Sequence, residues 1–331
     1  MKRLLIPLLL GFVVCLTACS GAQTADRPPQ EKTAAVTEAF AGSTADEARR
    51  DPYATDNRYD IDEKVFEKRG DVDYGTVQKD VTYYSKTAGD NKQCNILLPS
   101  GYSESQTYPV MYVFHGFGGS HSNQIDTDSY LTLLYGNMLR DGLTKPMIIV
   151  NVDMYTDKLA DKDSKTDEQL RYIYDKAIDD VALDLMPFIE QNYPVKTGRE
   201  NTAVAGLSEG GAKSLCTGFK WLDKFGYIGA FAPDTGVIPT EYYKGTFWNT
   251  PVLEKFPQPT AETTPYYLYM AVGSKDPWNI DCTLYYRDEL NKMGVKNQTD
   301  LAEGYEHDYK FWRQCFYNYL TKIFHTNTYN K

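Results

Sequence analysis

The sequence predicts an α/β fold in which a mostly parallel, doubly wound sheet is covered by helices on both faces. Short apolar runs bounded by turn residues have the pattern of strands buried on both sides, and they span residues 110–114, 147–150, 202–205, 227–231 and 266–272. Loops or stretches with helical spacing lie between them. Strands that alternate with helices indicate parallel pairing through crossover connections.

A hairpin is expected at the start of this domain. Residues 81–84 and 95–98 have the composition of two strands, and the Ala-Gly-Asp-Asn segment at 88–91 supplies turn residues between them. The pair is expected to add antiparallel strands at one edge of the sheet.

Three helices are predicted with some detail. One covers residues 130–139, and the last, rich in aromatic residues, covers 309–324. Between them a single apolar stripe indicates a long helix, which Pro187 is expected to kink or end near Met186; the stripe consists of Ile178, Val181, Leu185 and Ile189. Residues 235–264 break the rhythm and are interpreted as an insertion that walls a substrate cleft.

The N-terminus has the features of an export signal. Lys2 and Arg3 precede an apolar run at 4–16 that is too short for a stable membrane span, and small residues lead to Cys19. The ending Leu-Thr-Ala-Cys resembles the bacterial lipobox, which implies that Cys19 is acylated and anchors the protein to the outer face of a membrane. The expected organisation is a signal peptide at 1–18, a flexible tether at 19–50, an uncertain extension at 51–80 and one domain at 81–331.

The charge of the chain narrows the choice of partners. The 331 residues carry a formal net charge of −10, which becomes −12 when the two cations Lys2 and Arg3 leave with the signal. Phosphate binding needs grouped Lys and Arg, and no basic cluster is present, so nucleic acid is not expected as a partner. Adhesion to a lipid surface by charge alone is not expected either.

Six cysteines occur, of which Cys15 lies in the signal and Cys19 at the lipid site. The remaining four allow three disulfide pairings, and the sequence selects none of them: Cys94, Cys216, Cys282 and Cys315. No Cys or His spacing matches a zinc site, and the chain has only four histidines, so no metal is expected.

The segment Gly-Leu-Ser-Glu-Gly-Gly at 206–211 stands where a buried strand ends and a helix begins. Its small residues permit the sharp strand-to-helix turn that exposes a nucleophilic serine hydroxyl, here that of Ser208. The unpaired N–H groups and the positive dipole end of the helix favour an oxyanion nearby. Ser208 is therefore the expected nucleophile.

The segment His-Gly-Phe-Gly-Gly at 115–119 directly follows the first buried parallel strand. Such a glycine-rich loop lets the backbone approach a bound carbonyl, so the amides of Phe117 and Glu209 are the expected oxyanion donors. His115 ends the strand beneath the site and is expected to be structural. Two other histidines are expected to be solvated at the surface: His121 and His325.

Two later loops provide a supporting acid and a base. Asp276 follows the strand that ends at residue 272 and can orient an imidazole, and the rival acid is Asp234, after the strand that ends at residue 231. His307 precedes the last helix. The chain order Ser208, Asp276, His307 is the order that α/β hydrolases use, so these are the expected nucleophile, acid and base.

Together these motifs resemble the feruloyl esterase and acetylxylan esterase group, the esterase D-like branch of the α/β hydrolases. The resemblance covers about residues 80–325 and rests on the segments 115–120, 206–211, 273–276 and 307–309 with Trp312. It implies the α/β-hydrolase fold and hydrolysis of an ester on a carbohydrate, often a feruloyl or acetyl group on plant xylan. It also implies that no metal or organic cofactor takes part.

Two features depart from that group. Glu209 stands where methionine is common, and its charge is expected to suit the helix dipole, favour the protonated form of His307 and disfavour anionic substrates. Residues 121–124 follow the glycines without the tryptophan often found there. Three alternatives stay open: an acyltransferase, another esterase on the same fold, and a non-catalytic surface protein that binds carbohydrate.

Overall fold

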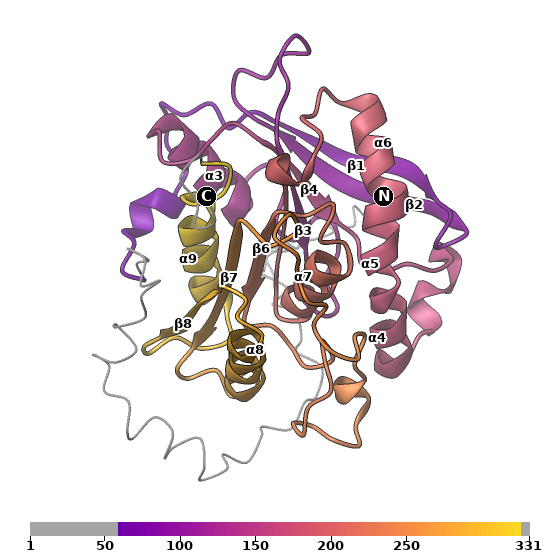
Figure 1. Ribbon diagram of the computed structural model, residues 1–331. Helices are drawn as coiled ribbons and strands as arrows, with labels where there is room; N and C mark the ends of the chain where they lie inside the picture. Colours follow the sequence, from indigo (N-terminus) through magenta and orange to yellow (C-terminus); the bar gives the residue numbers. More distant parts are fainter. Residues whose placement is uncertain (1–58, 326–331) are drawn as a thin grey trace, which may run out of the picture.

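An eight-stranded sheet forms the centre of the molecule in the computed structural model, which describes residues 59–325 (Figure 1). The strand order is β1-β2-β4-β3-β5-β6-β7-β8. The pairs β1-β2 and β2-β4 are antiparallel, and all other pairs are parallel. The predicted fold class is confirmed. The strands are β1 Thr76–Ser85, β2 Asp90–Leu98, β3 Val110–Phe114, β4 Ile148–Val152, β5 Thr202–Leu207, β6 Tyr227–Phe231, β7 Tyr267–Gly273 and β8 Gln298–Ala302.

The predicted hairpin corresponds to β1 and β2, and the five apolar runs correspond to β3 through β7. The sequence pattern misses β8. This strand lies at the edge of the sheet with β7 as its one neighbour, and its sequence Gln-Thr-Asp-Leu-Ala is partly exposed. An edge strand with one side open to solvent does not need the apolar run that identifies the buried strands.

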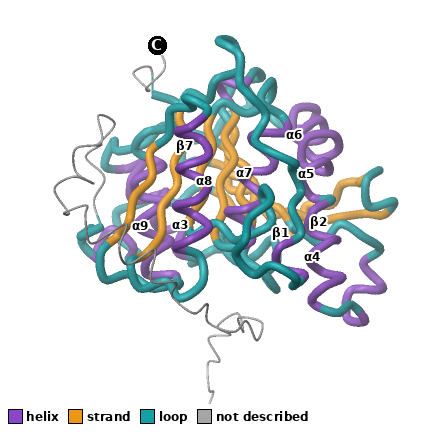
Figure 2. Tube along the Cα trace, turned by 60° about the horizontal axis from the view of Figure 1, so that its bottom comes forward, coloured by secondary structure: helices purple, strands orange, loops and turns teal. Residues whose placement is uncertain are grey.

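Helices cover both faces of the sheet, as Figure 2 shows. Helices α3 and α9 pack on one face, and α4 to α8 pack on the other. Alternate residues of one strand enter opposite cores, so Tyr112 joins the second group and Met111 and Val113 join the first. The helices are α3 Tyr130–Arg140, α4 Asp167–Asp175, α5 Ala177–Asp180, α6 Met186–Asn192, α7 Glu209–Lys220, α8 Ile280–Lys292 and α9 Tyr309–Leu320.

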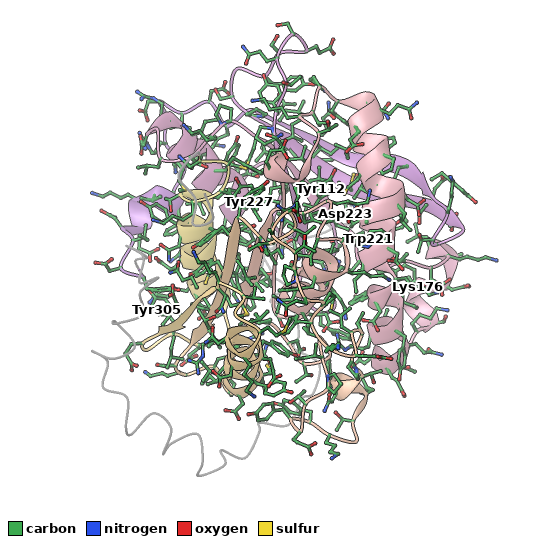
Figure 3. The ribbon with its side chains drawn as sticks, in the orientation of Figure 1. Tyr112, Lys176, Trp221, Asp223, Tyr227 and Tyr305 are labelled. Atoms are coloured by element: carbon green, nitrogen blue, oxygen red, sulfur yellow. The ribbon has the colours of Figure 1, made fainter. Side chains whose placement is uncertain are left out.

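The tyrosines serve both the interior and the rim of the molecule. Figure 3 shows Tyr112 and Tyr227 in the middle of the fold and Tyr305 near its periphery, beside β8. Tyr112 and Tyr227 are buried, whereas Tyr305 is partly exposed. These three tyrosines therefore do not share one surface.

The point where the chain changes direction across the sheet lies between β3 and β5. From β3 the chain passes to β4 on one side, and it then crosses to β5 on the other side of β3. Phe114 at the end of β3 pairs with Gly206 in β5. At such a switch point the connections leave in opposite directions and open a crevice at the carboxyl ends of the strands. The predicted site loops lie at this edge.

The prediction that Pro187 ends or kinks its helix near Met186 is only partly right, because the helix continues to Asn192 in α6. A π-helical turn, Val181–Leu185, joins α5 to α6, and in it the N–H of Met186 donates to the carbonyl of Val181. The wider turn takes up the irregularity that proline, with no N–H to donate, would otherwise force on a regular helix.

The described part of the N-terminal extension packs against the domain. A 3-10 turn, Glu63–Phe66, precedes β1, and Ile61 and Phe66 are buried in the core beneath α3 and α9. The hydroxyl of Tyr59 donates to Asp300 in β8 at 2.8 Å. Residues 59–80 thus join the first and last strands of the sheet. The predicted signal peptide, Cys19 and the tether lie outside the described residues.

The four cysteines whose pairing the sequence did not decide are all buried, and none forms a disulfide: Cys94, Cys216, Cys282 and Cys315. The structure therefore has none of the three possible pairings. Across residues 59–325, no helix has the length and apolar character needed to span a membrane.

Candidate active site

Ser208 stands in a strained turn between β5 and α7. Its φ of 55° and ψ of −123° lie where residues with a side chain are rare. Backbone bonds hold it there: its N–H donates to the carbonyl of Phe231 at 2.8 Å, and its carbonyl accepts from the N–H of Asp234 at 3.1 Å. At Gly210 a Cβ would lie 2.3 Å from the carbonyl oxygen of His115, so only glycine lets α7 begin this close to β3.

The three side chains expected to form a triad lie in one hydrogen-bonded chain. His307 Nε2 is 2.9 Å from Ser208 Oγ, and His307 Nδ1 is 2.6 Å from Asp276 Oδ2. The other oxygen of Asp276 accepts the N–H groups of Trp278 at 2.9 Å and Asn279 at 3.0 Å. This arrangement fits a neutral imidazole that donates from Nδ1 and accepts the serine proton at Nε2.

Two tryptophans enclose the imidazole. The rings of Trp278 and Trp312 meet His307 edge to face, with centroid distances of 5.2 and 5.0 Å. Only 5% of the His307 side chain is exposed. With water largely kept away from the ring, its hydrogen bonds to Ser208 and Asp276 are stronger than they would be at the surface.

The expected oxyanion donors lie on the two loops beside Ser208. Glu209 is the first residue of α7, so no carbonyl of α7 itself precedes its N–H to accept it. A Cβ on Gly116 would lie 3.8 Å from the Cβ of Ser208, which places the glycine loop against the nucleophile turn. Phe117 is partly buried, and its ring packs edge-on against Trp248 at 5.1 Å and Tyr174 at 5.6 Å.

The rival acid Asp234 also lies next to the site. Its Oδ1 accepts the N–H of Thr235 at 2.6 Å, and its own N–H donates to Ser208. The hydrogen bond of 2.6 Å to His307 Nδ1 comes from Asp276. This geometry gives Asp234 a part in shaping the turn around the serine and gives Asp276 the contact with the imidazole.

The other histidines differ from one another. His115 is fully buried, with Nδ1 donating to the carbonyl of Gly116 and Nε2 accepting the N–H of Met154, so its expected structural role agrees with its contacts. The expectation that His121 and His325 are solvated is wrong, because both are partly buried. His121 lies between two carboxylates, those of Asp153 at 3.0 Å and Asp80 at 2.9 Å.

Glu209 does not extend into the site as an isolated charge. Its side chain is fully buried, and one carboxylate oxygen accepts a hydrogen bond from Arg171 and forms an ion pair with Lys213. The expected influence of its negative charge on His307 is therefore offset by two cations. Sequence reasoning missed Arg171 and Lys213, since neither lies in a recognisable motif.

The segment at 235–264 forms a wall beside the site. Trp248 in its short 3-10 turn, Phe247–Asn249, is buried against Phe117. The adjoining residue Asn249 lines a pocket of about 520 Å³ between this segment and α8. Tyrosine rings and polar groups line the pocket, among them Thr240, Glu241, Tyr242 and Tyr285. Among residues 59–325, no group of three or more His, Cys, Asp and Glu side chains is placed to hold a metal ion.

Comparison with known proteins adds to this geometry. A family described as putative esterases matches residues 85–321. The chain belongs to this esterase family. A ferulic acid esterase from Anaeromyces mucronatus, solved in complex with ferulic acid, is 30% identical and superposes with a TM-score of 0.71 over 82% of this chain and 98% of that one. The fold is that of the α/β-hydrolase esterases.

Two further members of the comparison are more distant. The endo-1,4-beta-xylanase/feruloyl esterase of Xylanibacter ruminicola is 27% identical over 80% of this chain, which spans 33% of that protein, about a third of its length. An S954A mutant of a feruloyl esterase module from Clostridium thermocellum, complexed with sinapinate, has 17% identity and a TM-score of 0.58 over 82% of this chain and 95% of that one. That likeness shows the fold alone.

Proposed function

We propose that this esterase family member is a carboxylic ester hydrolase that works through an acyl-enzyme, with Ser208 as nucleophile, His307 as general base and Asp276 as the acid that orients it. The observation that carries the proposal is the continuous chain of hydrogen bonds from Ser208 Oγ through His307 to Asp276. In this order an acid orients a base, and the base can take the proton of a nucleophile.

The reaction follows from the positions of these groups. Ser208 Oγ attacks the ester carbonyl while His307 Nε2 takes its proton, and the amides of Phe117 and Glu209 hold the oxyanion. The intermediate collapses, the carbon–oxygen bond to the alcohol breaks, and His307 returns the proton to the departing alcohol. Water then attacks the acyl-enzyme by the same steps and releases the acid. No metal or organic cofactor is needed for this cycle.

The proposed substrates are feruloyl or acetyl esters of plant cell-wall polysaccharide. The names of the Anaeromyces and Xylanibacter relatives support a feruloyl group. Phe117, Trp248 and Tyr174 form an aromatic cluster next to the glycine loop that suits a flat aromatic acid. The sugar chain is assigned to the pocket lined by Tyr242, Tyr285 and polar groups, which adjoins the segment that carries Trp248. A screen against methyl ferulate, acetylated xylan and short nitrophenyl esters separates these acyl groups.

The proposed location is the outer face of the cell membrane, with lipid on Cys19. The support is the sequence pattern at residues 2–19. Labelled palmitate should enter the wild-type protein in a bacterial host and should not enter Cys19→Ser. Equal labelling of both proteins would refute the anchor.

The central experiment replaces Ser208 with Ala. Turnover of methyl ferulate should fall by several orders of magnitude, as it does when a triad residue is deleted, and a serine-directed organophosphonate should label the wild type but not the variant. Ser105→Ala is the matched control. Ser105 is exposed on the loop before β3, at the amino ends of the parallel strands, whereas the site lies at their carboxyl ends, so this variant should keep full activity.

Other outcomes distinguish the remaining alternatives. A folded wild-type protein that binds xylan but takes no label would support a non-catalytic binding protein. Labelling at Ser208 with release of the alcohol but transfer of the acyl group to an added sugar would support an acyltransferase. Near-normal hydrolysis by Ser208→Ala would end the assignment.

A further inference from the structure

Four charged side chains gather beneath the nucleophile turn: Arg171, Asp175, Glu209 and Lys213, together called the Arg171 cluster below. Arg171, Glu209 and Lys213 are fully buried, and the side chain of Asp175 is 23% exposed. The two cations and two anions sum to zero formal charge. They come from α4 and α7, so the cluster joins a helix far from Ser208 in sequence to the helix that begins directly after it.

Glu209 is the centre of the cluster. One oxygen of its carboxylate accepts from Arg171 Nη1 and forms an ion pair with Lys213 Nζ at 2.8 Å, and Lys213 also pairs with Asp175. Glu209 is the residue whose backbone N–H is assigned to the oxyanion in the proposed function. A group that holds its side chain therefore also restrains the start of α7, which carries that N–H.

Arg171 makes a second contact, which lies on the wall segment. Its Nη2 donates to the carbonyl of Thr235 at 2.6 Å, and the next residue, Gly236, must lack a side chain, because a Cβ there would lie 1.9 Å from Nη2. The hydroxyl of Thr235 donates to the carbonyl of Trp248, whose ring packs on Phe117. Arg171 is thus bonded to the nucleophile turn with one nitrogen and to the aromatic wall with the other.

Stability alone does not account for this arrangement. Burying three charges and partly burying a fourth costs free energy, and apolar groups of similar size often hold a protein together as well or better. Within the described part of the chain, Arg171 Nε and Glu209 Oε2 are buried without a hydrogen-bond partner, which adds to that cost. Burial and the charge of Arg171 lower the pKa of the Lys213 amine, although Asp175 opposes them.

We propose that Arg171 is a positioning residue that couples the aromatic wall to the oxyanion donor, so that an aromatic acyl group seated against Trp248 meets a correctly oriented Glu209 amide. This inference rests on the proposed function. It assigns to Arg171 a preference for aromatic over small acyl groups, which neither Ser208 nor His307 can provide.

The test compares Arg171→Met with the double variant Arg171→Met/Glu209→Met. In the single variant a buried carboxylate loses its main partner, so the melting temperature and kcat/KM for methyl ferulate both fall, the latter about 100-fold. In the double variant the broken charge pair is replaced by an apolar one, and the melting temperature returns to near the wild-type value. The carbonyl of Thr235 still lacks its donor.

Positioning and stability give different results in the double variant. If Arg171 positions the wall, the ratio of kcat/KM for methyl ferulate to kcat/KM for 4-nitrophenyl acetate stays about tenfold below its wild-type value, because only the aromatic acyl group uses the wall. If Arg171 serves stability only, both substrates recover together with the melting temperature, and the proposal is overturned.

The matched control is Asp179→Met/Lys220→Met. It removes an ion pair that also joins α7 to a neighbouring helix, with a distance of 2.8 Å, but at the surface. The ratio of the two substrates should not change in this control. Wild-type protein that hydrolyses neither ester refutes the proposed function itself, whereas active wild type with an unchanged ratio in the double variant refutes the role of Arg171 alone.

Discussion

Asp276 uses both of its oxygens, one for His307 and the other for the backbone that follows it. The two N–H bonds from Trp278 and Asn279 fix the carboxylate before any substrate arrives. Asp234 instead accepts from Thr235 and supports the turn around Ser208. The two acids at neighbouring strand ends therefore have separate tasks at the level of single atoms.

Replacing each acid with its amide should separate these tasks. Asp276→Asn can donate to His307 Nδ1 and thereby favour the wrong tautomer, so kcat on methyl ferulate should fall by about 10⁴ with little change in KM. Asp234→Asn keeps an oxygen for the N–H of Thr235 and should lose less than about tenfold. Equal losses in steady-state kinetics would return Asp234 to consideration as the supporting acid.

The residues of the site were predictable to different degrees. Ser208, Asp276 and His307 each lie in a short loop beside an apolar strand or an amphipathic helix, and their chain order alone suggested their relation. The partner of Glu209 was not predictable, because Arg171 lies 38 residues earlier in a polar helix and reaches the site only through the packing of α4 on α7. Long-range pairing of buried charges leaves no periodic signal in a single sequence.

A histidine, His121, holds the glycine loop after β3 in place. His121 lies at the end of that loop, and its ring bridges Asp153, just after β4, and Asp80, at a bulge in β1 with a φ of 53°. The carbonyl of His121 also accepts from the side chain of Asn151. Contacts to β1 and to the end of β4 thus anchor the segment that carries Phe117.

Stability should depend on pH through this anchor. Burial lowers the pKa of His121, but hydrogen bonds and the charges of Asp153 and Asp80 outweigh it, so the pKa is raised above 6.5. A raised pKa in the folded state means that the stabilisation is complete below the ordinary pKa and is lost as pH rises through the folded value. His121→Gln should therefore lower the melting temperature by about 2 °C or more at pH 5.5 and by much less at pH 9.

His325 offers a control, because its pKa is shifted in the opposite direction to that of His121. Burial lowers its pKa, so protonation of the unfolded chain opposes folding as pH falls. His325→Gln should therefore be no less stable than wild type at pH 5.5. Melting curves of the two variants that shift in parallel with pH would contradict both assignments.

The sequence predicted the strands that are buried on both faces and missed the strand at the edge of the sheet. Strands β3 to β7 are covered on both faces and appear as apolar runs, whereas β8 is polar because it lies at an edge. The long helix continues past Pro187 because a π turn precedes it, and that turn depends on how the helix packs. Composition gives no indication of such a local adjustment.

Residues 59–325 hold together without disulfides. The four described cysteines lie apart on β2, α7, α8 and α9, each within the packed interior. Burial raises the pKa of Cys94 and of Cys216 to about 12, so at neutral pH both remain protonated thiols. The stability of the domain has to come from its two cores.

The reactivity of the thiols should show that these four cysteines are buried and form no disulfide. Native protein should react very slowly with a disulfide reagent such as dithionitrobenzoate, because the thiolate is the reactive form and the thiols are buried. Unfolding in guanidinium should expose the four thiols to rapid reaction, and added reductant should leave the melting temperature unchanged. A fall in melting temperature with reductant would reveal a bridge.

The order of the strands also fixes when the molecule can first act. Ser208, Asp276 and His307 follow β5, β7 and β8, so a nascent chain acquires its proposed nucleophile 99 residues before its proposed base, which comes almost last. A fragment that stops before residue 307 would hold the serine with no group to take its proton. Ester turnover during synthesis or refolding would therefore report only on chains whose C-terminal strand and helix have already docked.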